Sequence, residues 1–197
     1  MVTKKSARGR PRDPATRKKI LAAARELLNE GGLSAVTMEA VAAKAGVGKP
    51  TIYREWPNAQ SVAMEAFLDT TKPQEQGRKR GKALDALRDQ LHSIIKTFST
   101  PTGRNTAMMI AAAQNDSELA KIFRNRFIMG RREEGRGILR AAVQARELRP
   151  DIDYEVTLDL IYAPLFFRLL IGHGPLDKAY ADAILDAALK GLKVRRG

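Results

Sequence analysis

Hydrogen-bond donors are concentrated in residues 49–54, which carry an ammonium group, two hydroxyl groups and a guanidinium group. Donors of these kinds bind the oxygen atoms of phosphates and the acceptor atoms on base edges. Pro50 has no amide proton and is tolerated in a helix only in the first turn, so the sequence predicts a short helix over residues 48–55. Val47 and Ile52 would point inward from it. The residues left to face outward are Lys49, Thr51, Tyr53 and Arg54.

The segment before this helix could position it. Thr37 is a natural N-cap, and Gly46 stands where a chain turns sharply out of a helix. Between them, four residues recur at the i, i+3, i+4 and i+7 spacing of a helix with one apolar face: Met38, Val41, Ala42 and Ala45. Two short helices joined by a glycine turn, with polar and basic residues on the outer face of the second, describe a helix-turn-helix. An ordinary helical hairpin with a solvated polar face is the alternative.

The stretch TMEAVAAKAGVGKPTIYREWPN, residues 37–58, resembles the DNA-binding segment of the TetR (tetracycline-repressor) family of bacterial transcription regulators. The resemblance extends over roughly residues 16–68. It implies that Lys49, Pro50 and Thr51 approach base edges or the groove wall. It also implies that Tyr53 and Thr37 contact phosphate, and the outward-facing Arg54 joins these DNA-binding candidates.

Two residues depart from the pattern of that family. Glu55 stands where a neutral residue is more usual, and an acid there would point away from phosphate. Ala59 occupies a position where many relatives carry a phosphate-binding lysine, so that contact is missing unless Lys44 or the N-terminal arm replaces it.

The positive charge is concentrated at the N-terminus. The net charge is +13, and over residues 1–19 eight Lys and Arg residues oppose one Asp, a net of +7. The segment Arg8-Gly9-Arg10-Pro11-Arg12 is similar to an AT-hook core, an extended segment whose arginines enter a narrow minor groove. We therefore expect residues 1–15 to be a flexible basic arm in which Arg8, Arg10 and Arg12 bind DNA. A solvated basic tail is the alternative.

The rest of the chain predicts an all-α fold of about nine helices: a three-helix head and a larger helical body. Residues 16–71 are expected to form the helix-turn-helix domain with a fourth, linking helix, in which Trp56 packs between the recognition helix and the next one. The polar, Gly- and Pro-containing segment 72–82 marks the boundary, and residues 72–197 form a ligand-binding and dimerisation domain. The helices expected in it span residues 83–98, 105–114, 117–146, 154–173 and 179–192, with a breaker at residues 100–103.

The helix expected over residues 154–173 is apolar nearly all round and must be covered on every side. One face could enter its own core, and the other could meet a twin subunit together with the last helix. This is the homodimer arrangement that the TetR resemblance implies, and a wholly intrachain core is the alternative. Twofold symmetry would place two recognition helices in successive major grooves, so the operator should be an imperfect palindrome.

The resemblance also implies a small hydrophobic effector that binds inside the C-terminal helices and shifts the protein to a state that releases DNA. Flexible sulfur-containing and aromatic side chains suit such a pocket. The candidate lining residues are Leu91, Met108, Met109, Phe123, Phe127, Tyr162 and Phe166. The same residue types build an ordinary helical core, so this assignment stays open.

Other functional classes receive no support from the sequence. With no cysteine and two histidines, we expect no metal and no cofactor. No glycine-rich phosphate loop, nucleophile elbow or spaced pair of carboxylates is present, so we do not expect an enzyme. No apolar run approaches the roughly 20 residues that span a bilayer, and no secretory signal is visible, which favours a cytoplasmic protein away from membranes.

These observations together predict a dimeric, sequence-specific DNA-binding transcriptional regulator. As the resemblance implies, it would be a repressor released from a palindromic operator by its effector. An architectural, nucleoid-type DNA-binding protein without an effector is the alternative, and it would show little sequence preference.

Overall fold

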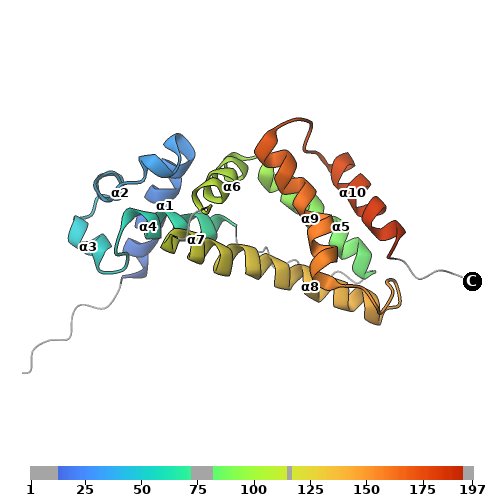
Figure 1. Cartoon of the computed structure of the whole chain (residues 1–197). Helices are drawn as coiled ribbons and strands as arrows, with labels where there is room; N and C mark the ends of the chain where they lie inside the picture. The colour runs from blue at the N-terminus through green and yellow to red at the C-terminus, as the bar shows by residue number, and fades with distance from the viewer. Residues whose placement is uncertain (1–12, 72–81, 115–116, 193–197) are drawn as a thin grey trace, which may run out of the picture. The chain divides into compact units, whose positions relative to one another are not determined.

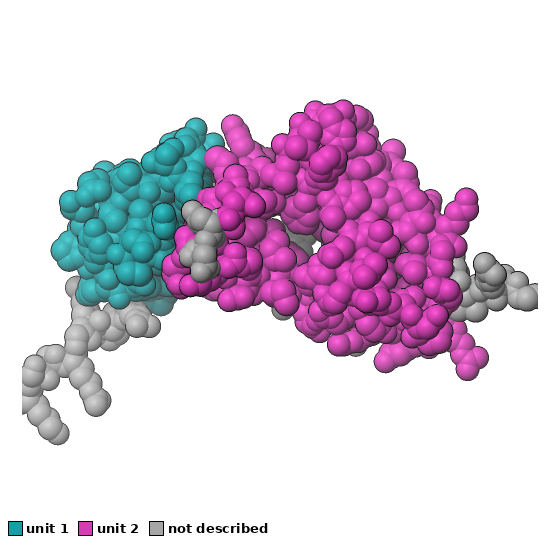
Figure 2. All heavy atoms as spheres, viewed as in Figure 1, with its two compact units in different colours: residues 1–66 teal, residues 67–197 magenta. Residues whose placement is uncertain are grey.

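The computed structural model describes residues 13–71, 82–114 and 117–192 of the chain. The chain forms two compact units, residues 1–66 and residues 67–197 (Figure 2). Helices and their connecting loops account for the described residues, so the expected all-α fold is confirmed. The domain boundary expected between residues 71 and 72 stays a prediction.

Unit 1 is built from short helices. They are α1 (Pro14–Gly31), the 3-10 turn η1 (Leu33–Ala35), α2 (Met38–Ala45) and α3 (Lys49–Tyr53), while α4 (Ala59–Thr70) begins in unit 1 and ends in unit 2 (Figure 1). Helix α1 includes Pro14 because Asp13 caps it: Asp13 Oδ1 accepts the backbone N–H of Ala15 at 3.0 Å. Proline fits the first turn, where its missing amide proton has no partner in the helix.

Thr37 and Gly46 delimit α2 as the sequence predicts. Thr37 Oγ1 accepts the backbone N–H of Ala40 at 3.1 Å. Gly46 has a φ of 65°, in the left-handed region that a side chain disfavours, and the N–H of Val47 donates to the carbonyl oxygen of Ala42 at 3.0 Å. This turn redirects the chain into α3, which confirms the helix-turn-helix.

The apolar faces of α1, α2 and α3 meet in the core of unit 1. Ile52, on α3, is fully buried, and so is Val41 on α2. The buried residues of α1 include Ile20, Ala24 and Leu28. Ile52 is the one buried residue of the five-residue α3, so the position of this short helix depends on Ile52 and on the residues that flank the helix.

Unit 2 consists of longer helices. They are α5 (Ala83–Phe98), α6 (Pro101–Ala112), α7 (Glu118–Ile122), the π-helix η2 (Phe123–Ile128), α8 (Met129–Gln144), α9 (Tyr154–Ile171) and α10 (Lys178–Lys190). The expected breaker at residues 100–103 is wrong, because these residues start α6. Thr100 Oγ1 accepts the N–H of Thr102 at 3.2 Å, and Pro101 stands in the first turn, where a proline is compatible with a helix.

Ser117 caps α7 as expected, since its Oγ accepts the N–H of Ala120 at 3.2 Å. Helices α7, η2 and α8 follow one another without a break and together form the long helix predicted from the sequence. Counting them as one, the described residues hold nine α-helices. Within η2 the rings of Phe123 and Phe127 stack with centroids 5.1 Å apart, and Phe67 lies 5.1 Å from Phe127.

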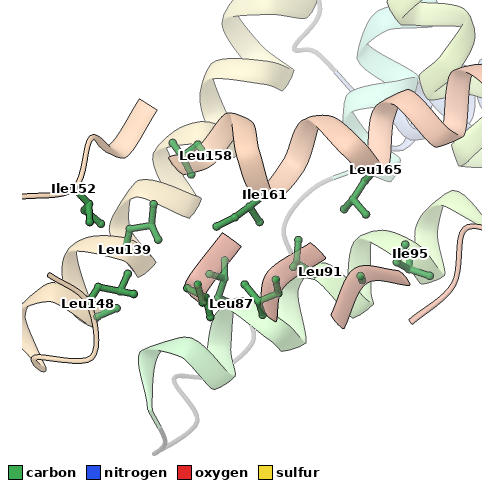
Figure 3. Packing of buried hydrophobic residues seen from close by; sticks show 13 residues of the cluster. Leu87, Leu91, Ile95, Leu139, Leu148, Ile152, Leu158, Ile161 and Leu165 are labelled. Carbon is green, nitrogen blue, oxygen red and sulfur yellow. The ribbon is translucent and has the colours of Figure 1, made fainter. Parts of the chain in front are cut away.

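The core of unit 2 lies among α5, α8, α9 and α10 (Figure 3). Its buried members include Leu87, Leu91, Leu139, Leu158, Ile161, Leu165 and Leu185. Helices α8 and α9 approach closely at Gly135, where an added Cβ would lie 2.7 Å from Leu158 Cδ2 and 3.0 Å from the hydroxyl oxygen of Tyr162. The Tyr162 hydroxyl donates to Gln90 Oε1, and burial raises the pKa of this phenol.

Charged side chains join α5 to α10. Arg88 donates to Asp182 Oδ1 at 2.5 Å and to Asp186 Oδ1 at 2.9 Å, and His92 Nε2 lies 2.8 Å from Asp182 Oδ1. Burial alone would raise the pKa of Asp182, but its hydrogen bonds with His92 and Arg88 outweigh burial and lower that pKa.

The N-terminus of α5 is capped by a residue that lies far along the chain. Lys82, at the N-cap position, makes no side-chain capping bond. The backbone N–H groups of Ala83 and Leu84 instead donate to the two carboxylate oxygens of Glu147, each at 3.0 Å. Glu147, in the loop after α8, thus replaces a local cap.

Candidate DNA-binding site

Helix α3 presents its polar face to solvent. Lys49, Pro50, Tyr53 and Arg54 are exposed, Thr51 is half-buried, and Ile52 on the opposite face is fully buried. At the start of α2, Thr37 is also exposed. Its hydroxyl oxygen accepts the capping bond, so the hydroxyl proton remains available to a phosphate oxygen. The structure thus places the six candidates of the helix-turn-helix on or beside one exposed element, while their role in DNA binding stays a prediction.

Lys49 makes an ion pair that the sequence does not predict. Its Nζ lies 2.9 Å from Glu39 Oε1 on α2, and both side chains are more than half exposed. The hydrogen bond to Glu39 raises the pKa of Lys49, and the hydrogen bond from Lys49 lowers the pKa of Glu39. The Glu39 carboxylate therefore neutralises one of the cations that the resemblance assigns to DNA. Glu39 and Lys49 are ten positions apart on different helices, which is why helical spacing gave no sign of the pair.

Arg54 and Lys44 also have partners within unit 1. Arg54 Nη2 donates to Thr51 Oγ1 at 3.3 Å. Lys44 lies 2.7 Å from Glu30 and 3.3 Å from Glu26, both on α1. The suggestion that Lys44 replaces the lysine missing at position 59 would therefore require it to leave these carboxylates.

Glu55 and Trp56, which follow α3, are directed into unit 1. Trp56 is 3% exposed, as expected for a residue that packs between helices, and its indole N–H donates to Glu65 Oε2 on α4 at 2.6 Å. Glu55 Oε2 accepts a hydrogen bond from Arg17 Nε at 2.9 Å. The unusual acid at position 55 thus has a partner on α1 and does not need to face phosphate.

The candidate arginines of the arm, Arg8, Arg10 and Arg12, lie outside the described residues. Their minor-groove role stays a prediction.

The seven candidate effector-binding residues fall into groups within unit 2. Phe123 and Phe127 belong to the aromatic cluster with Phe67. Leu91 is a member of the main core, against which Tyr162 packs. Phe166 contacts Phe98 with ring centroids 5.4 Å apart. On α6, Met109 is 1% exposed and Met108 is half-buried. Several of these side chains therefore serve as core, and their role as a pocket lining stays a prediction.

Helix α9 carries an exposed apolar face. Of the large apolar side chains that are exposed in the described residues, five lie on α9: Val156, Leu160, Phe167, Leu170 and Ile171, at 44% to 61% exposure. The remaining two are Tyr53 on α3 and Met129 on α8. Exposed apolar patches of this kind mark interaction surfaces. Among the described helices, none is long and apolar enough to cross a membrane.

Two family models match the chain. The model described as bacterial regulatory proteins, tetR family, matches residues 20–65. The model described as tetracyclin repressor-like, C-terminal domain, matches residues 79–188. The first match contains the helix-turn-helix, and the second contains α5 through most of α10.

Several known proteins are similar over nearly their whole length. The HTH-type transcriptional regulator YdeS of Bacillus subtilis (strain 168) is 37% identical over 188 residues, which are 95% of each protein. The DNA-binding transcriptional repressor TetR of Mycobacteroides abscessus is 29% identical over 93% of this chain and 94% of its own. The crystal structure of the TetR family transcription regulator SCO0332 is 32% identical, covers 92% of this chain and 99% of its own, and superimposes with a TM-score of 0.71. The matches to both family models and the similarity to these relatives show that the chain belongs to the TetR family of transcription regulators. Members of this family bind DNA through the helix-turn-helix, which the fold of this chain contains.

Proposed function

We propose that the protein is a transcriptional repressor that binds a palindromic DNA operator as a homodimer and leaves it when a small hydrophobic effector binds unit 2. The observation that carries this proposal is the two-sided character of α3. Ile52 anchors one face with no exposed surface, and Lys49, Tyr53 and Arg54 are exposed. A short helix held in this way can enter the major groove with its donors directed at base edges and phosphates.

The proposed homodimer rests on the exposed face of α9. Its members Val156, Leu160, Ala163, Phe167 and Leu170 are spaced by four and three residues in alternation, the spacing of helices that pack along one seam. Beside α9, the exposed positions of α10 include Ala179, Ala183 and Ala187. Small residues there allow a second helix pair to approach, so α9 and α10 from two chains can form a four-helix interface.

The proposed effector site rests on the aromatic and sulfur-containing side chains of unit 2. Phe98 and Phe166 provide an edge-to-face pair, and Met108 and Met109 lie on neighbouring α6. A small apolar ligand would fit among these aromatic and methionine side chains. It would shift the equilibrium between the DNA-bound and the released state only if it binds one state more tightly than the other.

A selection experiment tests the DNA-binding part of the proposal. The full-length protein is mixed with a library of random duplexes, and the enriched sequences are then compared by fluorescence anisotropy with scrambled duplexes of equal composition. We expect an imperfect palindrome to be enriched and to bind at least about 1,000-fold more tightly than its scrambled form at physiological salt. Equal affinities would remove the repressor proposal and favour the architectural alternative.

Point variants test whether α3 is the element that binds the operator. Lys49→Ala and Tyr53→Phe should each weaken operator binding. Lys96→Ala, which removes an equivalent exposed charge from α5 in unit 2, is the matched control and should leave the affinity unchanged. If the control weakens binding as much as Lys49→Ala, net charge rather than α3 determines the affinity.

A further inference from the structure

Four side chains from three parts of unit 1 meet in a cluster that no DNA-binding role explains. Arg17 of α1 donates through Nε to Glu55 Oε2 at 2.9 Å and through Nη2 to Glu65 Oε1. The Arg17 Cζ atom lies 5.3 Å from the centroid of the Trp56 ring, and the Trp56 indole donates to the second oxygen of Glu65 at 2.6 Å. We call Arg17, Glu55, Trp56 and Glu65 the Arg17 cluster.

The geometry of the cluster uses properties that are specific to arginine. A guanidinium group presents several donors in one plane, so a single Arg17 can bind two carboxylates while its face covers an aromatic ring. The hydrogen bond that Arg17 donates to Glu65 is the main cause that raises the pKa of Arg17. The side chains of Glu55 and Glu65 are 21% and 25% exposed, so removal of Arg17 would leave two partly buried anions close together without their shared cation.

The cluster also determines what the end of α3 is attached to. Helix α3 ends at Tyr53, and Glu55 and Trp56 follow it directly. Through these two residues the C-terminal end of α3 is bound to α1 by Arg17 and to α4 by Glu65.

We propose that Arg17 is a positioning residue that fixes the orientation of α3 against α1 and α4, rather than a residue that contacts DNA. This inference rests on the proposed DNA-binding function of α3. The competing interpretation is a phosphate contact, because Arg17 lies in the first turn of α1, where basic residues and a helix N-terminus could bind an anion together.

The salt dependence of operator affinity separates the two roles. A lost phosphate contact makes the slope of log K against log salt shallower by roughly 0.9. A lost positioning residue leaves the number of phosphate contacts in the bound state unchanged. For Arg17→Gln we therefore expect an affinity at least about tenfold lower at every salt concentration with an unchanged slope. A slope shallower by roughly 0.9, with little loss at high salt, would overturn the proposal in favour of a phosphate contact.

Trp56 provides a second readout that does not require DNA. It is the single tryptophan of the chain, so the fluorescence of the whole protein reports on the Arg17 cluster. We expect Arg17→Gln to shift the emission to longer wavelength and to increase quenching by acrylamide, because the ring loses its cover. Lys18→Gln removes the same charge from the neighbouring exposed position and should leave the emission unchanged.

Two further variants keep the test decisive if Arg17→Gln folds poorly. Arg17→Lys retains the charge but cannot bind both carboxylates in one plane, so it should lower operator affinity nearly as much as Arg17→Gln. Glu65→Gln removes the carboxylate on α4 and should do the same, again with an unchanged salt slope. Full affinity and unchanged Trp56 emission in Arg17→Lys would contradict the positioning role.

The outcomes also distinguish this inference from the proposed function. If the wild-type protein selects no sequence, the proposed function fails, and the Trp56 measurements still show whether Arg17 covers the Trp56 ring. If the wild-type protein binds its operator and the Arg17 variants bind equally well with normal emission, only the positioning role is wrong.

Discussion

Replacement of Phe167 by alanine should weaken the proposed homodimer by an amount that the exposed area of the ring predicts. Phe167 is 56% exposed. Applied to a phenylalanine of roughly 200 Å², this leaves about 110 Å² for a partner to cover. At about 25 cal/mol per Å², its burial contributes at most about 3 kcal/mol per chain, and twofold symmetry counts it twice. If half of this total is realised, the dissociation constant of the dimer rises by about 100-fold.

Sedimentation equilibrium over a range of protein concentrations measures this change directly. Met129→Ala is the matched control, because Met129 is also a large apolar side chain at 50% exposure but lies on α8. We expect the dimer dissociation constant of Met129→Ala to match that of the wild type. A Phe167→Ala protein with an unchanged constant, or a Met129→Ala protein weakened to the same degree, would show that the exposed face of α9 is not the dimer interface.

Three other changes have defined outcomes. Glu39→Gln frees Lys49 and removes an anion from the proposed DNA-binding surface, so anisotropy titrations should show tighter operator binding and a salt slope steeper by up to roughly 0.9. Weaker binding would mean that the ion pair orients Lys49. Gly135→Ala should lower the free energy of unfolding in urea by about 1–3 kcal/mol, because the added methyl group collides with side chains of α9. Gly137→Ala, whose added Cβ meets nothing within 4 Å, should raise it by about 0.5–1 kcal/mol, and equal effects of the two variants would refute the close approach at Gly135. Because its folded pKa is depressed, the stabilisation contributed by Asp182 is fully present above its unfolded pKa and is lost as the pH falls through the lower folded value. The difference in unfolding free energy between the wild type and Asp182→Asn should therefore shrink as the pH falls below about 4.

Most of the helices could be predicted from the sequence because caps, glycine turns and apolar spacing act between residues that are close in the chain. The bounds of α5 agree with prediction, since its leucine and isoleucine stripe is continuous between a polar segment and Ser99. The start of α6 was wrong because Pro101 was interpreted as a breaker, although proline is compatible with a first helical turn. The π-helical turn at residues 123–128 could not be predicted, since its apolar spacing is also compatible with an α-helix.

Side-chain partners were largely beyond the reach of the sequence. Arg17 meets Glu55 and Glu65 at separations of 38 and 48 residues in the sequence. Such pairs depend on how helices pack, which periodicity does not specify. The composition of α9 did indicate a helix with more apolar surface than its own core can cover, and its exposed residues agree with that reasoning.

Because the Glu147 carboxylate caps the N-terminus of α5, this helix obtains its cap late in translation. The two amides it binds belong to residues 64 and 63 positions earlier in the chain. At translation rates of about 5–20 residues per second, the ribosome needs roughly 3–13 seconds to supply their partner. A nascent chain that pauses before Glu147 therefore holds an α5 whose first turn is still unfinished, and the earliest-made helix of unit 2 is completed by one of its later loops.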